Sequence, residues 1–353
     1  MIDLKQYGFT QTSPKTPGII PGRVIEHQRE KYTVITQYGE ITASLKGTFH
    51  HSAKAQRNFP CVGDFVLLQY NESGDSRIAE LLPRSSKFSR ADFSGHKAGY
   101  VKTIKEQVVA ANFDYVFILS SLNQDFNVSR ILRYLTQAYS SGGQPVIVLT
   151  KADLADDIET PVSMVEHAAP EVPVIAVSGH TGIGIQLLSK FLQPGKTIVF
   201  LGMSGVGKSS LLNALMDEEV MEVSGIREDD SRGRHTTTHR QLFMLPSGAM
   251  VIDTPGMREL GFFDADDGIS TGFADVEELF SQCRFSDCGH ITEPGCAVRA
   301  ALTGGSLQPE RWERYQAQRR ENRFVEDKAS YMREKEAGYK SIALYSKSIK
   351  KKR

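Results

Sequence analysis

Short β-prone runs separated by turn residues extend from Arg23 to about Leu82 of this 353-residue chain. About five strands within roughly 60 residues predict a small closed barrel. We place this OB-like β-barrel at residues 21–85. Residues 1–20 are polar and contain two prolines, so we expect a flexible arm there.

From about residue 113 the pattern changes to continuous apolar runs of strand length, separated by segments of helical periodicity. Four runs end in a small or polar residue where a loop should begin: FDYVFILS, PVIVLTKAD, VPVIAVSG and TIVFLGMSG. Further on, residues 242–256 read as a hairpin with its turn at Pro246-Ser247-Gly248. This alternation predicts a doubly wound α/β domain, which we place at 86–272. In such domains ligands bind at the carboxyl ends of the strands.

The remaining residues, 273–353, predict a third, helical domain. An amphipathic run leads into a Cys/His cluster, and a long charged helix is expected to begin at Pro309, since proline suits the first position of a helix. The final KKKR is expected to be disordered. The chain shows no run of about 18 apolar residues and no export signal, so we expect a cytoplasmic protein without a membrane partner.

The zero net charge of the chain hides a strong asymmetry. Residues 1–90, 91–310 and 311–353 carry net charges of +4, −12 and +8. An acidic middle between basic ends is typical of a protein that holds a polyanion by its ends, although the basic tail could also be a solvated surface. The barrel could bind nucleic acid through aromatic residues or serve as a spacer. The candidate aromatic residues for nucleic-acid contact are Tyr32, Tyr38 and Phe49, which could equally be core residues.

The segment GMSGVGKS at 202–209 fits the phosphate-loop pattern between a predicted strand and a predicted helix. Glycines allow the backbone N–H groups to curl around the phosphates, and the Ser209 hydroxyl can bind Mg²⁺. Lys208 neutralises the phosphate charge, and we predict that it is one of the catalytic groups. The predicted nucleotide contacts of this loop are Gly202, Ser204, Gly205, Val206, Gly207, Lys208, Ser209 and Ser210.

Two segments downstream of this loop are expected to sense the terminal phosphate. Asp253 begins the sequence DTPG at a strand end, where it can hold Mg²⁺ through water while the Gly256 N–H contacts the γ-phosphate. Between the loop and DTPG lies SRGRHTTTHR, which is either a switch or a solvated surface loop. Any of its three threonines could complete the Mg²⁺ shell. We predict that Thr237 is the Mg²⁺ ligand, with Thr236 and Thr238 as alternatives.

Two upstream strand ends carry residues suited to a guanine base. Asp153 of TKAD can accept two hydrogen bonds from guanine, a pairing that adenine does not offer, while the Lys151 stem covers the base. Thr150 precedes them, and Ser178 and Gly179 of VSGHTG can cap the base edge through their backbone N–H groups. Together these motifs indicate GTP rather than ATP.

Three cysteines and a histidine in the C-terminal region form the pattern C-x₄-C-x-H-x₅-C. Three thiolates and one imidazole suit tetrahedral Zn²⁺, and four protein ligands leave no position open for a catalytic water. We therefore predict one structural zinc ion, bound by Cys283, Cys288, His290 and Cys296. The fourth cysteine, Cys61, is far away in the sequence and is expected to be a core residue.

The order of these motifs is rotated relative to ordinary GTPases, since the base-reading motif precedes the phosphate loop. With a barrel before it and a Cys/His cluster after it, the chain resembles the ribosome small subunit-dependent (RsgA or YjeQ) family of circularly permuted GTPases over about residues 20–325. The matching stretches are GMSGVGKSSLLN, GRHTTTHR, DTPG and CRFSDCGHITEPGCAV. The resemblance implies a GTP/GDP switch, active as a monomer, that hydrolyses GTP in late assembly of the 30S ribosomal subunit and docks on 16S rRNA.

Two positions depart from the common GTPase pattern. Met257 stands where many GTPases have a glutamine that orients water, and its side chain is no hydrogen-bond donor, so slow intrinsic hydrolysis is expected. The resemblance implies that a switch histidine or the ribosome completes the site, with His235 as first candidate and His239 as second. Thr150 stands where asparagine is usual, which removes an amide contact and could modestly weaken nucleotide affinity.

Two other functions remain open at this point. The chain could be an RNA-binding module whose GTP/GDP site is structural and does not turn over, with Met257 marking lost hydrolysis. A phosphoryl-transfer kinase would use the same loop, but the sequence indicates no acceptor pocket.

Overall fold

The computed structural model describes residues 1–11, 16–28, 30–47, 59–92, 105–123, 126–220, 240–253 and 266–326. The chain divides into two compact units. The first comprises Met1–Ser89 and Gln107–Leu260, and the second comprises Arg90–Glu106 and Gly261–Arg353. The predicted barrel and most of the predicted GTPase domain therefore belong to one compact unit, while residues 90–106 and 261–272 of that predicted domain belong to the second. Among the described residues, no helix is both long and apolar enough to span a bilayer.

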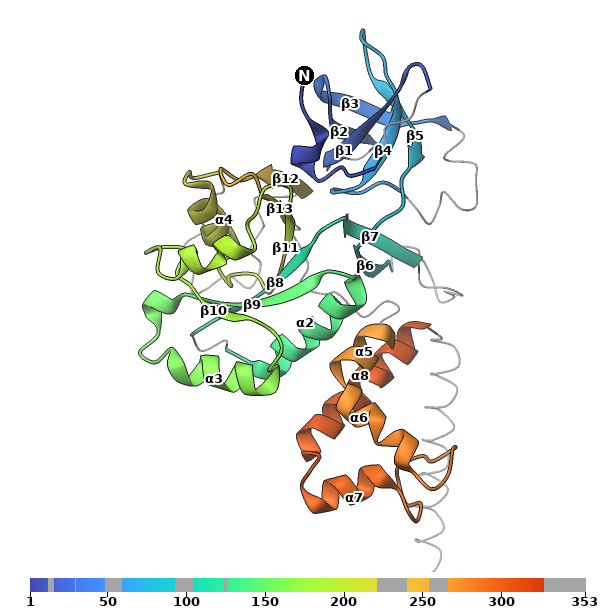
Figure 1. The fold of residues 1–353 in the computed structure, drawn as a ribbon, viewed down its shortest axis with the longest axis vertical. Helices are drawn as coiled ribbons and strands as arrows, with labels where there is room; N and C mark the ends of the chain where they lie inside the picture. Colours follow the sequence, from blue (N-terminus) through green and yellow to red (C-terminus); the bar gives the residue numbers. More distant parts are fainter. Residues whose placement is uncertain are drawn as a thin grey trace, which may run out of the picture. The chain divides into compact units, whose positions relative to one another are not determined.

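The predicted five-stranded barrel is confirmed (Figure 1). Its strands are β1 (Ile19–Gln28), β2 (Lys31–Thr36), β3 (Gly39–Leu45), β4 (Phe65–Gln69) and β5 (Ser76–Leu81). β1 pairs with both β2 and β4, and β5 pairs with β3 and β4, so the ladder closes. Val34 and Leu68 are fully buried inside it. Gly22 allows the close approach, because a Cβ there would lie 2.6 Å from the side chain of Val34.

The N-terminal arm is folded in its described part, contrary to the expected flexible arm. Residues Leu4–Tyr7 form a short 3-10 helix, and the Asp3 side chain accepts a hydrogen bond from the Lys5 N–H at 3.0 Å. Leu4 and Phe9 are buried in the core of the first unit. Two apolar side chains thus anchor a segment that is otherwise polar.

The aromatic residues of the barrel differ in exposure. Tyr32 is buried and stacks on His27 with ring centres 4.4 Å apart, so of the two alternatives it is a core residue and not a nucleic-acid contact. Tyr38 is 53% exposed and stacks on Tyr70. Phe49 lies outside the described residues.

A largely parallel sheet follows in the same unit, with strand order β10-β9-β8-β11-β13. Its strands are β8 (Tyr115–Ser121), β9 (Gln144–Thr150), β10 (Val174–Ala176), β11 (Thr197–Leu201) and β13 (Met250–Asp253). The helical elements between them are α2 (Val128–Ser141), η3 (Ala152–Leu154), α3 (Glu159–Ala168), η4 (Ile185–Lys190) and α4 (Lys208–Met216). Antiparallel β12 (Arg240–Met244) completes the predicted hairpin with β13.

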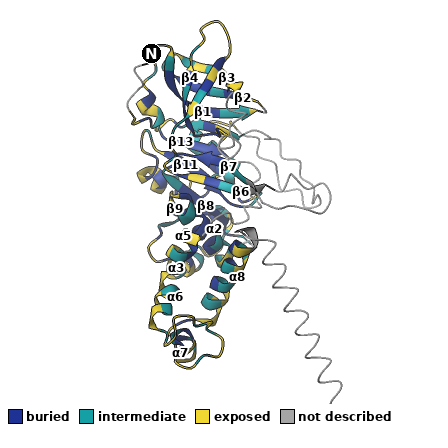
Figure 2. Cartoon of the chain, turned by 90° about the vertical axis from the view of Figure 1, so that its right-hand side faces the viewer, coloured by how far each residue is buried: buried dark blue, intermediate teal, exposed yellow. Residues whose placement is uncertain are grey.

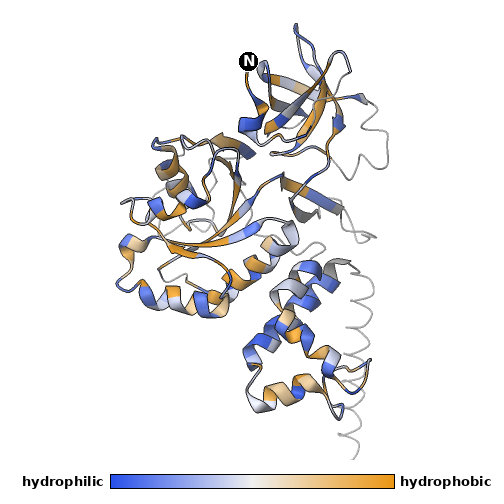
Figure 3. Ribbon diagram, viewed as in Figure 1, coloured by the Kyte–Doolittle hydropathy of each residue, from blue (hydrophilic) through white to orange (hydrophobic). Residues whose placement is uncertain are grey.

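This sheet is covered on both faces, as its continuous apolar strands predict. Ile118 of β8 packs with α2 in one buried cluster. Its neighbours Phe117 and Leu119 pack with α4 in another cluster, because successive side chains of a strand point to opposite faces. Figure 2 shows the central strands as buried, and Figure 3 shows them as mostly hydrophobic.

Strand β1 of the barrel also pairs with β12, so the two sheets form one ladder of eleven strands. The opposed residues are Glu26 with Gln241 and His27 with Arg240. β6 (Lys87–Asp92) and β7 (Lys105–Ala111) form a separate two-stranded sheet. Neither pairing was predicted from the sequence.

The described part of the second unit is helical. It contains α5 (Asp266–Gly272), α6 (Ala274–Glu278), η6 (Phe280–Gln282), α7 (Ala297–Gly304) and α8 (Pro309–Glu326), which begins at the predicted proline. Phe273 and Tyr315 pack in its core with ring centres 5.6 Å apart. Arg311 of α8 donates to both carboxylate oxygens of Asp275. These contacts join α8 to the helices before the Cys/His cluster.

Candidate nucleotide site and metal centre

The phosphate loop connects the fully buried strand β11 to helix α4. Its backbone requires glycine, since Gly205 and Gly207 have φ angles of +74° and +97°. At Gly202, a Cβ would lie 2.7 Å from the carbonyl oxygen of Leu119 on the neighbouring strand. The chain therefore curls as it must to aim successive N–H groups at an anion.

The Lys208 ammonium lies across this loop. Its Nζ donates to the carbonyl oxygens of Gly202 at 2.7 Å and Met203 at 2.6 Å. A lysine so placed can exchange carbonyl partners for phosphate oxygens when a nucleotide enters. Ser204, Ser209 and Ser210 are half-buried around the same loop.

Thr150, at the end of β9, is bonded directly to the phosphate loop. Its buried hydroxyl donates to the carbonyl oxygen of Val206 at 2.5 Å, and the Ser120 carbonyl oxygen lies 3.4 Å away. The amide contact expected from an asparagine here is thus replaced by a hydroxyl contact to the loop. Lys151 follows with φ of +60°, and Asp153 is half-buried in η3.

The predicted base cap lies beside both of these segments. The Val177 carbonyl oxygen accepts from Ala152 N–H at 3.1 Å, which ties the cap strand to TKAD. Ser178 is fully buried, and its Oγ accepts from the Thr181 N–H at 3.0 Å. A Cβ on Gly179 would lie 2.7 Å from the backbone carbon of Ser210 in α4. The cap loop therefore packs against the backbone of the phosphate-binding helix.

Three of the predicted loops thus meet at one edge of the sheet. The contact of Thr150 with Val206 and the packing of Gly179 on α4 place TKAD, the cap and the phosphate loop together. Asp253 ends β13, which runs parallel to β11, so it reaches the same edge. Asp253 is only 8% exposed.

Several predicted site residues lie outside the described part of the chain, and their roles stay predictions. They are His235, Thr236, Thr237, Thr238, His239, Gly256 and Met257. Residues of α2 near the site were missed from the sequence. Arg130 and Tyr134 line a depression beside Met203 and Ser204 of the phosphate loop, but no motif on α2 could have indicated them.

The four predicted zinc ligands come together in the second unit. The candidate ligand atoms of Cys283, Cys288, His290 and Cys296 all lie within 4.8 Å of one another. His290 Nδ1 is 3.6 Å from Cys283 Sγ and 3.5 Å from Cys296 Sγ. Usual Zn–S and Zn–N bond lengths at tetrahedral angles give an S···N separation of about 3.6 Å. The residues therefore fit a four-coordinate zinc ion.

The backbone around these ligands is held by a carboxylate and an aromatic cluster. Glu293 accepts hydrogen bonds from the N–H groups of Gly289, Ile291 and Thr292 at 2.9 to 3.0 Å. Backbone hydrogen bonds lower the pKa of Glu293 to about 2. The His290 ring stacks on Phe280 with centres 4.4 Å apart. Glu293 thus holds the backbone on both sides of His290, and Phe280 packs against the His290 ring.

The Thr150 contact yields a prediction about nucleotide affinity. Thr150→Val removes the donor and leaves the buried Val206 carbonyl without it, which typically costs about 1–3 kcal/mol. We expect the Kd for GDP, measured by fluorescence titration, to rise about tenfold. Thr136→Val removes a similar buried hydroxyl from α2 and serves as the control. An unchanged GDP affinity in the Thr150 variant would contradict this role.

The parallel sheet, the rotated order of its motifs and the convergence of its loops define a circularly permuted GTPase. Two solved structures share the fold. The first, YjeQ from Thermotoga maritima, has a TM-score of 0.61 and 28% identity, with coverage of 85% of this chain and 96% of that chain. The second is YloQ, described as a circularly permuted GTPase, with a TM-score of 0.58, 24% identity and coverage of 87% and 96%.

The chain belongs to the RsgA GTPase family, whose sequence profile matches residues 81–263. It is 44% identical over 324 residues to small ribosomal subunit biogenesis GTPase RsgA 2 of Lactiplantibacillus plantarum, covering 91% of this chain and 89% of that protein. It is 45% identical over 324 residues to RsgA 2 of Listeria monocytogenes, covering 90% and 89%. The protein is therefore an enzyme that hydrolyses GTP, and this contradicts a site that does not turn over.

Proposed function

We propose that the protein is a nucleotide-dependent switch that acts late in assembly of the small ribosomal subunit and is activated by that subunit. The observation that carries this proposal is the 44% identity, over 91% of the chain, to a relative named as a small ribosomal subunit biogenesis GTPase. Such a role places the protein in the cytoplasm. The basic ends of the chain, with net charges of +4 and +8, suit a polyanionic partner.

In this proposal, Lys208 and the backbone N–H groups of residues 204–210 hold the phosphates of GTP. Ser209 and Thr237 would bind Mg²⁺ directly, with Thr236 and Thr238 as alternatives to Thr237, and Asp253 would bind it through water. The ion would neutralise charge that develops between the β- and γ-phosphates. The Gly256 N–H would contact the γ-phosphate.

Guanine would be recognised by Asp153, with the Lys151 stem covering the ring and the Ser178 and Gly179 backbone capping its edge. The support is geometric, since contacts from Thr150 and Gly179 bring these segments to the phosphate loop.

Water would be oriented by His235, or else by His239, because Met257 cannot make the hydrogen bonds of a glutamine. We propose that the small subunit completes this arrangement and accelerates hydrolysis. Departure of the γ-phosphate would then change the affinity of the monomeric protein for the subunit.

Contact with 16S rRNA would involve the barrel and the zinc-containing unit. Tyr38 remains a candidate for this contact because it is more than half exposed on the barrel surface. The zinc ion would be structural and would fix the loop that bears Phe285 and Ile291, both exposed.

The proposal is tested by GTP turnover with and without purified small subunits. We expect slow turnover alone and an increase of at least about tenfold in kcat with subunits, because a completed catalytic group is commonly worth 10²-fold or more. Lys208→Ala should abolish GTP turnover both with and without subunits. Equal turnover with and without subunits would contradict activation, and equal co-sedimentation with GDP and a non-hydrolysable GTP analogue would contradict switching.

A further inference from the structure

Arg23 of β1 is a buried positive charge at the junction between the barrel and the GTPase sheet. It has no exposed surface. Its Nε donates to the Gly63 carbonyl at 3.1 Å, Nη1 to the Tyr7 carbonyl at 2.7 Å, and Nη2 to the Asn112 carbonyl at 2.7 Å. The guanidinium also lies 4.9 Å from the ring centre of Phe65. Burial lowers its pKa to about 10, so it is charged at neutral pH.

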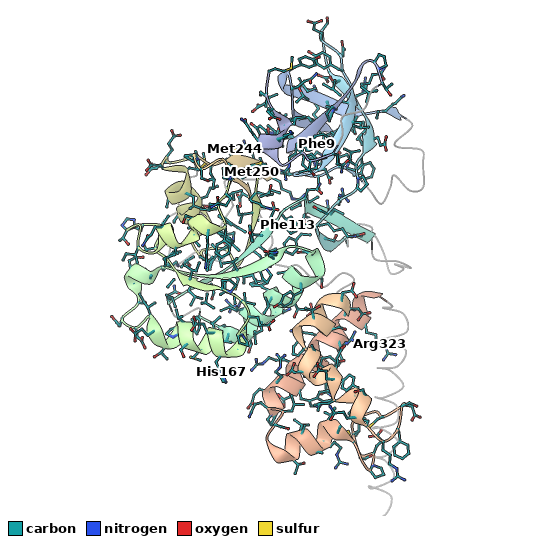
Figure 4. The ribbon with its side chains drawn as sticks, viewed as in Figure 1. Phe9, Phe113, His167, Met244, Met250 and Arg323 are labelled. Carbon is teal, nitrogen blue, oxygen red and sulfur yellow. The ribbon has the colours of Figure 1, made fainter. Side chains whose placement is uncertain are left out.

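The partners of Arg23 belong to separate parts of the fold. Tyr7 lies in the N-terminal 3-10 helix, Gly63 lies in the turn before β4, and Asn112 lies between β7 and β8. A further contact from Nη1 reaches Sδ of Met250, the first residue of β13, at 3.3 Å. Met250 is labelled in Figure 4. Since a buried charge requires its full set of partners, Arg23 fixes these parts in one arrangement.

The strands held at this junction lead to both predicted phosphate sensors. β12, paired with β1, begins at Arg240, directly after the segment that contains the threonine switch. Its Gln241 is opposite Asp253, where DTPG begins. An edge strand with unpaired backbone groups is a site for another chain to add. Here the barrel of the same chain occupies that edge.

We propose that Arg23 is a positioning residue for the stimulation of GTP hydrolysis by the ligand of the barrel, and not for basal turnover. It ties barrel strand β1, which pairs with β12, to Met250 of β13, so that the ligand of the barrel acts on Asp253 at the end of β13. This inference rests on the proposed function, in which the ligand is the small subunit.

The test compares Arg23→Met and Arg23→Lys with Arg77→Met in full-length protein. Arg77 is an exposed barrel arginine that donates to Ser44 Oγ within the barrel, so its loss leaves the junction intact. We expect Arg23→Met to lose most of the roughly tenfold subunit stimulation of kcat, while basal turnover and the Kd for GDP stay within about twofold. Arg23→Lys should recover part of the stimulation.

The outcomes separate this inference from the proposed function. Wild-type protein that subunits fail to stimulate refutes the proposed function. If subunits stimulate the wild-type protein, two results refute only the role of Arg23. One is full stimulation retained in Arg23→Met, and the other is an equal loss of stimulation in Arg77→Met.

If Arg23→Met does not fold, a double-cysteine variant tests whether β1 must stay joined to β12 for stimulation. Glu26 and Gln241 are opposite each other, and opposed residues at about 4.5–5.5 Å between Cα atoms suit a disulfide. We expect the oxidised E26C/Q241C protein to keep its subunit stimulation relative to its reduced form, because β1 and β12 stay joined throughout the cycle. Loss of stimulation on oxidation, absent in wild-type protein treated identically, would overturn the proposal.

Discussion

Asp153→Asn is expected to shift the base preference of the enzyme from GTP toward XTP. In the proposed site the carboxylate accepts from the N1–H and the exocyclic amine of guanine, whereas an asparagine amide can donate to the extra carbonyl of xanthine. Sites built around such hydrogen bonds reject analogues that lack a partner by about 10⁴-fold or more. We expect GTP affinity to fall by about 10²- to 10³-fold and XTP affinity to rise, as measured by competition against a fluorescent nucleotide.

The matched control for this change is Asp156→Asn, three residues further along the chain. Asp156 is exposed and belongs to no predicted nucleotide contact, so its variant should bind GTP like the wild-type protein. If Asp153→Asn kept its preference for GTP, Asp153 would not read the base.

Cys288→Ser is expected to empty the zinc site. Structural zinc sites contribute about 10–16 kcal/mol of apparent binding free energy, so loss of one of four ligands should remove roughly a quarter of it. That corresponds to about 10²- to 10³-fold in zinc affinity. Atomic absorption should show less than about a tenth of the wild-type zinc content after dialysis against a chelator, and hydrogen exchange should accelerate across 283–296.

Two controls accompany the zinc variant. Asp287→Asn changes an exposed charge in the same loop and should retain zinc. GDP affinity of Cys288→Ser should be unchanged, because the nucleotide loops belong to the first compact unit and the zinc ligands to the second. Full zinc retention in Cys288→Ser would exclude it as a ligand.

The fold was predictable where local patterns reflect burial. Continuous apolar strands predicted the covered parallel sheet, and Pro309 predicted the start of α8. The burial of Tyr32 was also readable, since Tyr32 and Val34 share one face of β2 and both are buried. The pairing of β1 with β12 was not predictable, because strand pairs more than 200 residues apart leave no local pattern in either strand.

The site was predictable to the level of motifs and strand ends. Because the carboxyl ends of parallel strands lie at one edge of a sheet, the order of motifs sufficed to expect that TKAD and the phosphate loop converge. The contacts that fix the loops were not predictable. The bond from Thr150 to Val206 and the packing of Gly179 on Ser210 depend on how closely the two backbones approach each other. The residue types in these segments do not determine that distance.

The central claim is that the base-reading loops, which come first in this rotated chain, and the phosphate loop, which follows them, form a single crevice selective for guanine nucleotides. Its most direct test is equilibrium displacement of a fluorescent GDP analogue from the native protein by unlabelled GTP and by ATP. We predict that GTP displaces the analogue stoichiometrically at one site per chain and that ATP requires at least about a thousandfold higher concentration. Displacement by ATP at the same concentrations as GTP would contradict the claim.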